Sequence, residues 1–209
     1  MNNSEKPKNI IDITKMIPNL VVDLAYATEN NFTAQVVPGY LENVALLSTE
    51  AMQKLKLIQT EANIFGLGLK IFDAYRPTQA VNFFYEIWRL QSENAAIKKR
   101  YYPKLTKEEL FLKGYIATRS SHSRASTVDL TLINVLTGQE LDMGTEFDFF
   151  GEQSHTSYIK LTPLQKKNRL LLKSLMEKYD FVNYQNEWWH YRLQNEPYSV
   201  EFDFPVKKD

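Results

Sequence analysis

The sequence contains no cysteine, which excludes disulfide bonds, thiolate metal ligands and a cysteine nucleophile. It also lacks an excess of charge of either sign, because 25 basic residues balance 25 acidic residues. Such a balance provides no basic field that would attract nucleic acid or an anionic membrane. The first ten residues contain no apolar run. We therefore expect no signal peptide or membrane span there, and a cytoplasmic or periplasmic protein.

The length and composition predict a single domain over residues 1–209. A chain of 209 residues with 44% hydrophobic content is large enough to bury one sizeable core. The polar residues 1–10 are expected to be poorly ordered. No internal repeat or low-complexity segment divides the chain.

Apolar spacing and turn residues predict an α+β fold, with a mainly antiparallel sheet flanked by helices. Helices are expected where capping residues precede a three-to-four repeat of apolar residues, and strands where β-branched and aromatic residues lie between turn signals. The expected helices are 48–65, 78–90, 106–113 and 162–179. The expected strands are 20–26, 69–75, 127–135, a return strand toward 141 after a turn at 136–139, 181–184 and 188–193.

Two short stretches contain the residue types of a hydrolytic zinc site. His122 and Asp129 have six residues between them, and Glu187 precedes His190 by three positions. Catalytic zinc prefers three nitrogen or oxygen ligands and leaves one position open, which predicts His122, Asp129 and His190 as ligands. These spacings cannot converge on ideal strands, where residues three or seven apart face opposite sides. We therefore expect His122 on a loop, Asp129 on a strand and Glu187 at a bent strand entrance.

The remaining polar residues near these stretches suit the same chemistry. Glu187 is a candidate general base, Arg76 can stabilise a developing oxyanion, and Asp73 can orient Arg76. The alternative for these three is a salt bridge beside the sheet. A structural zinc site is less consistent with the sequence, because such sites usually close with a fourth ligand and favour thiolates. We expect His155 and the pair Trp188–Trp189 to be packing residues.

Six sequence blocks together resemble the D-alanyl-D-alanine dipeptidases of the VanX type, a branch of the zinc D,D-peptidases. The resemblance extends from about residue 20 to 195, and Glu-Trp-Trp-His with the upstream Ser-x-His is its specific combination. The blocks are Asn31–Thr33, Asp73–Pro77, Ser120–Arg124, Asp129–Leu132, Asp142–Thr145 and Glu187–Tyr191.

The resemblance implies that one zinc ion per chain supports hydrolysis of D-Ala-D-Ala to two D-alanines in peptidoglycan metabolism. It implies a small zwitterionic dipeptide as the partner, and neither nucleic acid nor a membrane. Asp148 and Tyr26 match the positions that hold the amino end, while Ser120, Tyr40 and Tyr115 match those at the carboxylate end. The three tyrosines could equally be half-buried packing residues.

Two other functions are consistent with the same residues. One is a zinc D,D-carboxypeptidase that trims longer peptidoglycan stem peptides, which would need an open cleft. The other is a zinc-bearing binding module without turnover, suggested only by Ala125 in the ligand loop. The family usually has glycine where this chain has Ala34, Ala125 and Asp180. Alanine at 125 would carry no conformational cost if the backbone φ there were negative.

Overall fold

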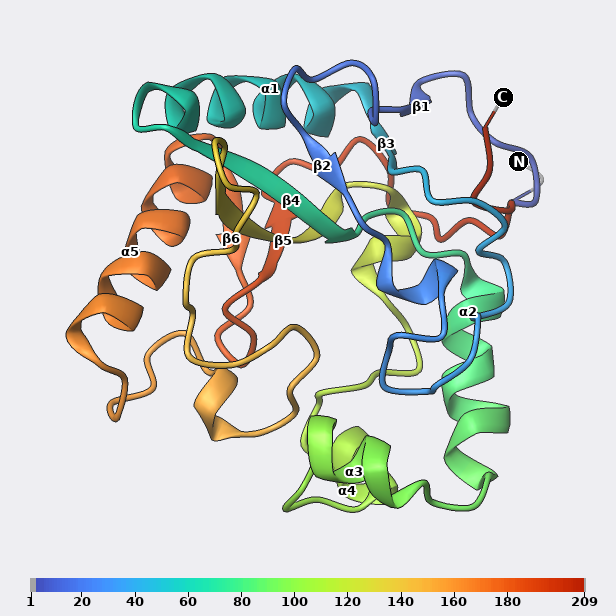
Figure 1. Ribbon diagram of the computed structural model, residues 1–209. Coiled ribbons are helices and arrows are strands. Elements are labelled where there is room, and N and C mark those ends of the chain that lie inside the picture. The colour runs from blue at the N-terminus through green and yellow to red at the C-terminus, as the bar shows by residue number, and fades with distance from the viewer. Residues whose placement is uncertain (1–2, 209) are drawn as a thin grey trace.

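A five-stranded sheet crosses the middle of the computed structural model, which describes residues 3–208 (Figure 1). Its strand order is β2-β4-β5-β7-β6, and only the pair β2–β4 is parallel. This arrangement confirms the α+β prediction with a mainly antiparallel sheet. The strands are β2 (Val21–Val22), β4 (Leu67–Asp73), β5 (Thr127–Asn134), β6 (Phe181–Asn183) and β7 (His190–Leu193).

Two long helices cover part of this sheet, and both were predicted. Helix α1 (Thr49–Ile64) begins at Ser48, whose hydroxyl accepts from the amide of Ala51 at 3.3 Å. Helix α5 (Pro163–Lys178) begins with a capping box formed by Thr162 and Gln165. Each cap satisfies amides that a helix leaves unpaired at its start. Helix α1 packs against β4 and α5 packs against β6 (Figure 1).

The predicted helix over residues 78–90 is helical but irregular. It consists of α2 (Thr78–Asn82), the π turn η2 (Phe83–Ile87) and the 3-10 turn η3 (Trp88–Leu90). Phe83, Phe84 and Trp88 are all buried. The wider π turn changes the direction of successive side chains, which allows adjacent aromatic rings to enter one core.

Helices α3 (Ala95–Tyr101) and α4 (Lys107–Leu112) lie at the end of the molecule opposite α1 in Figure 1. The predicted capping box of α4 is present, with Thr106 and Glu109 as its members. Helix α3 was not predicted, although Asn94 caps it by accepting from two amides of its first turn.

The first predicted strand is much shorter than expected. Only Val21–Val22 pairs, and the chain then enters the 3-10 turn η1 (Ala25–Ala27), which buries Tyr26. A separate two-stranded sheet, β1 (Ile10–Asp12) with β3 (Leu46–Ser48), was not predicted. Ile10 is fully buried in it, while residues 1–2 of the segment expected to be poorly ordered lie outside the described residues. The return strand toward residue 141 is reduced to one bridge between Ile133 and Glu140.

The three positions at which the resemblance implies glycine all have a left-handed backbone. The φ angles are +55° at Ala34, +57° at Ala125 and +68° at Asp180. The negative φ considered for Ala125 is therefore not what the structure shows. A side chain in this region costs roughly 1–2 kcal/mol relative to glycine, so this chain tolerates strain at three turns.

Candidate active site

Three candidate residues form one row across the centre of the sheet. Asp129 on β5 is directly opposite His190 on β7 and Asp73 on β4. The register of β4 shifts by one residue between Ile71 and Asp73. A bulge of this kind re-aims the following side chain, and it is the reason that Asp73 joins the row.

His122 reaches this row from a loop. It belongs to the 3-10 turn η4 (Ser121–Arg124), which begins after Ser120 and ends at Ala125. Its ring is buried, and its Nδ1–H donates to the carbonyl of Ala74 at 2.7 Å. That bond fixes the ring orientation and leaves the Nε2 lone pair facing the row. The expected placement of His122 on a loop and Asp129 on a strand is confirmed.

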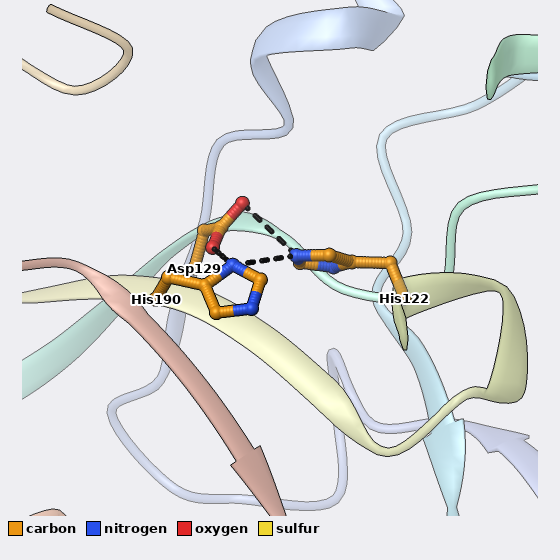
Figure 2. Close-up of side chains that lie close together, drawn as sticks. All are labelled: His122, Asp129 and His190. Carbon is orange, nitrogen blue, oxygen red and sulfur yellow. Dashed lines mark hydrogen bonds and ion pairs between the residues drawn. The ribbon is translucent and has the colours of Figure 1, made fainter. Parts of the chain in front are cut away.

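His122, Asp129 and His190 converge on one point (Figure 2). His122 Nε2 lies 3.3 Å from Asp129 Oδ2 and 3.3 Å from His190 Nδ1. His190 Nδ1 lies 3.0 Å from Asp129 Oδ1. All the donor atoms lie within 4.8 Å of one another, which is a spacing at which one metal ion can contact all three.

The chemistry of this donor set also fits a metal ion. Asp129 Oδ1 is buried and accepts no hydrogen bond in the described structure, although His190 Nδ1 is nearby. A carboxylate oxygen and an imidazole nitrogen that face each other without a hydrogen bond suit a shared cation. Burial alone would raise the pKa of Asp129, but the two histidines more than offset it and hold that pKa well below its usual value. The carboxylate is thus available as a ligand.

Glu187 lies beside the cluster on the turn that leads into β7. Its amide donates to the carbonyl of Tyr184, and its own carbonyl accepts from the amide of His190, so the chain bends here as expected. Its Oε2 is 3.5 Å from His190 Nδ1. Burial, followed by repulsion from Asp129 and Asp148, raises the pKa of Glu187 well above its ordinary value. The carboxyl is therefore close to the metal position and suited to carrying a proton.

Arg76 follows β4 and is held by two acids. Its Nε donates to Asp73 Oδ2 at 2.9 Å, and its Nη2 lies 3.4 Å from Asp129 Oδ2. The guanidinium also lies 5.0 Å from the ring centre of Tyr26. Asp73 is fully buried and accepts a second bond from Tyr40 at 2.7 Å. Asp73 therefore orients Arg76, as the sequence suggested.

A cavity of about 410 Å³ opens over these residues. Asp148 lines it, held in a left-handed conformation with φ of +60°. The hydroxyl of Tyr26 donates to Asp148 Oδ2 at 2.8 Å. Burial and the nearby Asp129 raise the pKa of Asp148 well above its usual range. Phe32, Phe84 and Phe150 form an apolar part of the wall.

The residues predicted at the carboxylate end of the substrate are not all together. Ser120 and Tyr115 line the cavity, and the hydroxyl of Tyr115 lies 2.9 Å from His155 Nε2. Tyr40 is buried, is not among the lining residues, and is engaged by Asp73. Among the charged lining residues, sequence reasoning missed Arg119 and Arg192.

The tryptophans adjacent to His190 are packing residues, as expected. Trp188 and Trp189 are 2% and 1% exposed, and their rings meet edge to face at 5.2 Å. They lie in the turn before β7, so they do not alternate across a strand. The indole of Trp188 donates to Thr145 at 2.8 Å, which ties this turn to the loop that contains Asp148.

Comparisons with known proteins show which proteins this chain is similar to. The family profile described as D-ala-D-ala dipeptidase matches residues 6–207. A D-alanyl-D-alanine dipeptidase of Enterococcus faecium is 44% identical over 186 residues, which cover 88% of this chain and 92% of the relative. Proteins with the same name from Streptomyces coelicolor and Escherichia coli are 39% and 33% identical, over 93% and 88% of this chain and 96% and 84% of the relatives. Among the described residues, no helix is long and apolar enough to cross a membrane.

Proposed function

The chain belongs to the D-ala-D-ala dipeptidase family of peptidases, and from this premise we propose that it hydrolyses free D-Ala-D-Ala to two D-alanines with one zinc ion. The observation that best supports the proposal is the cluster of His122, Asp129 and His190 with Glu187 beside it, inside a cavity that also contains Asp148. Nitrogen and oxygen ligands without thiolates are typical of catalytic zinc.

In this proposal the two imidazoles and the Asp129 carboxylate hold the metal. His122 offers Nε2, because its Nδ1–H is bonded to Ala74, and His190 offers Nδ1. Zinc in such a site lowers the pKa of water from about 16 to roughly 7 and polarises a carbonyl. The remaining chemistry depends on residues of the chain.

Glu187 moves the proton. Its carboxylate takes a proton from the attacking water and delivers it to the departing amine, so that one group serves as base and then as acid. Arg76 stabilises the negative charge that develops on the carbonyl oxygen. Because Asp73 holds its Nε, the guanidinium is oriented before the substrate arrives. The hydroxyl of Tyr40 donates to Asp73 and so helps to hold the Asp73 carboxylate in place.

Asp148 and Tyr26 are proposed to bind the ammonium group of the dipeptide, and Ser120 and Tyr115 to contact its other end. A buried carboxylate that has lost its cation partner is costly, typically by several kcal/mol. An acylated amino group would impose that loss on Asp148. The site is therefore expected to favour a free dipeptide over a blocked or longer peptide.

The test compares free D-Ala-D-Ala, its N-acetyl derivative and a longer stem peptide, each with and without chelator. We expect metal-dependent hydrolysis of the free dipeptide alone. Equal cleavage of the stem peptide would favour a carboxypeptidase, and absence of all turnover would favour a binding module.

The same assay on Glu187→Gln tests the proposed base. The amide keeps the shape of the side chain but cannot accept a proton, so kcat should fall by at least about 100-fold while zinc content is retained. The matched control is Glu86→Gln, because Glu86 is exposed and lies outside the cavity lining. Turnover close to that of the control would remove Glu187 from the mechanism.

A further inference from the structure

Charge is distributed unevenly between the depth and the rim of the cavity. The interior contains the buried carboxyl groups of Asp129, Asp148 and Glu187, together with Arg76, which is paired with Asp73 and Asp129. Arg119 and Arg192 line the same cavity, and their side chains are 78% and 41% exposed. A zwitterionic ligand therefore meets more acids than cations at the inner end, and the two arginines nearer to solvent.

Arg192 has a defined position relative to the three candidate metal ligands, His122, Asp129 and His190. It lies two residues after His190 on β7, so both side chains are on the same face of the strand. In the sheet, His190 pairs with Asp129 and Arg192 pairs with Thr127. The two Cα atoms on a strand are separated by about 6.5–7 Å, which is roughly the length of two extended residues. Arg192 thus lies one step along the strand from the row of metal ligands.

The Arg192 guanidinium uses only one of its nitrogens for a hydrogen bond in the described structure. Its Nη1 donates to Glu196 Oε2 at 3.2 Å. The same oxygen accepts from Arg124 Nε and Nη2 at 3.0 and 2.7 Å, and the Glu196 side chain is only 10% exposed. Two guanidinium groups therefore share one carboxylate, which leaves net positive charge. In the described structure the other nitrogens of Arg192 form no hydrogen bond, so they remain available to a ligand.

Resting on the function proposed above, we propose that Arg192 binds the free carboxylate of the second residue of the dipeptide and selects substrates that end there. When the scissile carbonyl is at the metal cluster, this carboxylate lies about one extended residue further along. A dipeptide that extends along β7 from the metal ligands would bring this carboxylate toward the guanidinium. A planar fork suits a carboxylate because it can donate two parallel hydrogen bonds.

Arg119 is the weaker candidate for the same role. Its Nε donates to both oxygens of Glu201, at 3.1 and 3.3 Å, so one carboxylate neutralises one guanidinium. Its greater exposure also weakens any charge interaction through solvent screening. Arg192 combines less exposure, a surplus of positive charge and a fixed place beside His190.

The experiment measures kcat and KM for D-Ala-D-Ala and for its C-terminal amide. For the unaltered protein we expect a clear preference for the free acid. Arg192→Gln should raise KM for the acid by about tenfold, equivalent to about 1.4 kcal/mol, with a much smaller effect on the amide. The ratio of the two kcat/KM values should therefore move toward one, and Arg192→Lys should recover part of it.

Two further variants make the result specific. Arg124→Gln alters the same Glu196 cluster, but Arg124 is not among the cavity-lining residues, so the acid-to-amide preference should persist. Arg119→Gln tests the competing residue. The Arg192 assignment is overturned if Arg192→Gln keeps the full preference, or if Arg119→Gln removes it instead. Failure of the unaltered protein to cleave D-Ala-D-Ala would overturn the proposed function, and it is detected before any variant is compared.

A binding measurement removes the dependence on turnover. In a Glu187→Gln background, calorimetry gives the Kd for D-Ala-D-Ala directly. Adding Arg192→Gln should weaken this binding by the same factor of about ten. An unchanged Kd would exclude a carboxylate contact at Arg192.

Discussion

Two alanines, Ala34 and Ala125, have the left-handed backbone that glycine adopts without strain. Ala34 and Ala125 have almost the same φ, at +55° and +57°, but different surroundings. The Ala125 side chain is fully buried, whereas Ala34 is half-buried in a surface loop. Glycine would relieve strain at both positions, but at Ala125 it would also remove a buried methyl group.

Ala34→Gly and Ala125→Gly should therefore differ in their effect on stability. Relief of the left-handed strain raises the free energy of unfolding by roughly 1–2 kcal/mol. The greater flexibility of glycine in the unfolded chain lowers it by about 0.5–1 kcal/mol. At Ala125 the loss of the buried methyl group lowers the free energy of unfolding by a further ~0.8 kcal/mol. Urea unfolding should show a gain of up to about 1.5 kcal/mol for Ala34→Gly, and a change that is ~0.8 kcal/mol less favourable for Ala125→Gly. Activity of Ala125→Gly should stay within a few-fold, since the turn is already formed.

A gain in turnover for Ala125→Gly well beyond that range would contradict this account. It would mean that the methyl group distorts the turn that contains His122. Zinc content of both variants, measured in parallel, separates a change in the metal site from a change in stability alone.

At the scale of elements, helix α5 positions the loop that contains Asp148. Arg169 on α5 is 2% exposed and forms no ion pair with an acid among the described residues 3–208. Its guanidinium donates to the carbonyls of Met143, Gln153 and His155 at 2.6, 2.8 and 2.7 Å. Burial lowers the pKa of Arg169 to about 10, so it stays charged at neutral pH. One side chain therefore fastens both ends of the loop to the helix.

Arg169→Lys should loosen this loop without emptying the site. Lysine retains the charge but cannot reach three carbonyls at once, and each buried carbonyl left unpaired costs about 1–3 kcal/mol. We expect a lower free energy of unfolding, together with a rise in KM for the dipeptide that exceeds any fall in kcat. The control is Lys173→Met on the same helix, which removes only a partly exposed pair with Glu177 worth about 0.3–0.5 kcal/mol. A normal KM in Arg169→Lys would show that α5 does not position Asp148.

The elements also show what the sequence could and could not predict. The capped helices α1, α4 and α5 were predictable because Ser48, Thr106 and Thr162 provide local hydrogen bonds that start them. The strands β1, β2 and β3 are only two or three residues long, and their pairing depends on distant partners. No periodic pattern can indicate such short strands.

The residues of the candidate site also differ in whether the sequence alone could identify them. His122, Asp129, His190 and Glu187 could be identified from spacing and residue chemistry, and the structure brings them together. Arg192 could also have been found, because a strand at 188–193 places it on the face of His190. The position of Tyr40 behind Asp73 could not, since it depends on the bulge in β4 and on contacts between residues 33 positions apart.

At the scale of the whole molecule, the site concentrates carboxyl groups inside the fold. Asp73, Asp129, Asp148 and Glu187 are all buried, and Arg76 is in contact with Asp73 and Asp129. Buried charges of one sign destabilise a folded protein unless a cation compensates them. A bound divalent ion would supply that compensation, and it would bind the folded chain alone, because His190 is 61 positions from Asp129 in the sequence and meets it only in the fold.

Removal of the metal should therefore lower the thermal stability of the whole protein. With free zinc at about 100 times Kd, binding adds about 2.7 kcal/mol to the free energy of unfolding. For a chain of this size each kcal/mol corresponds to about 2–4 °C, so a chelator should lower Tm by about 5–10 °C. In His190→Ala, which loses a ligand, Tm should be nearly the same with and without zinc. An equal metal response in the parent and in His190→Ala would place the stabilising ion elsewhere and refute the His122, Asp129 and His190 site.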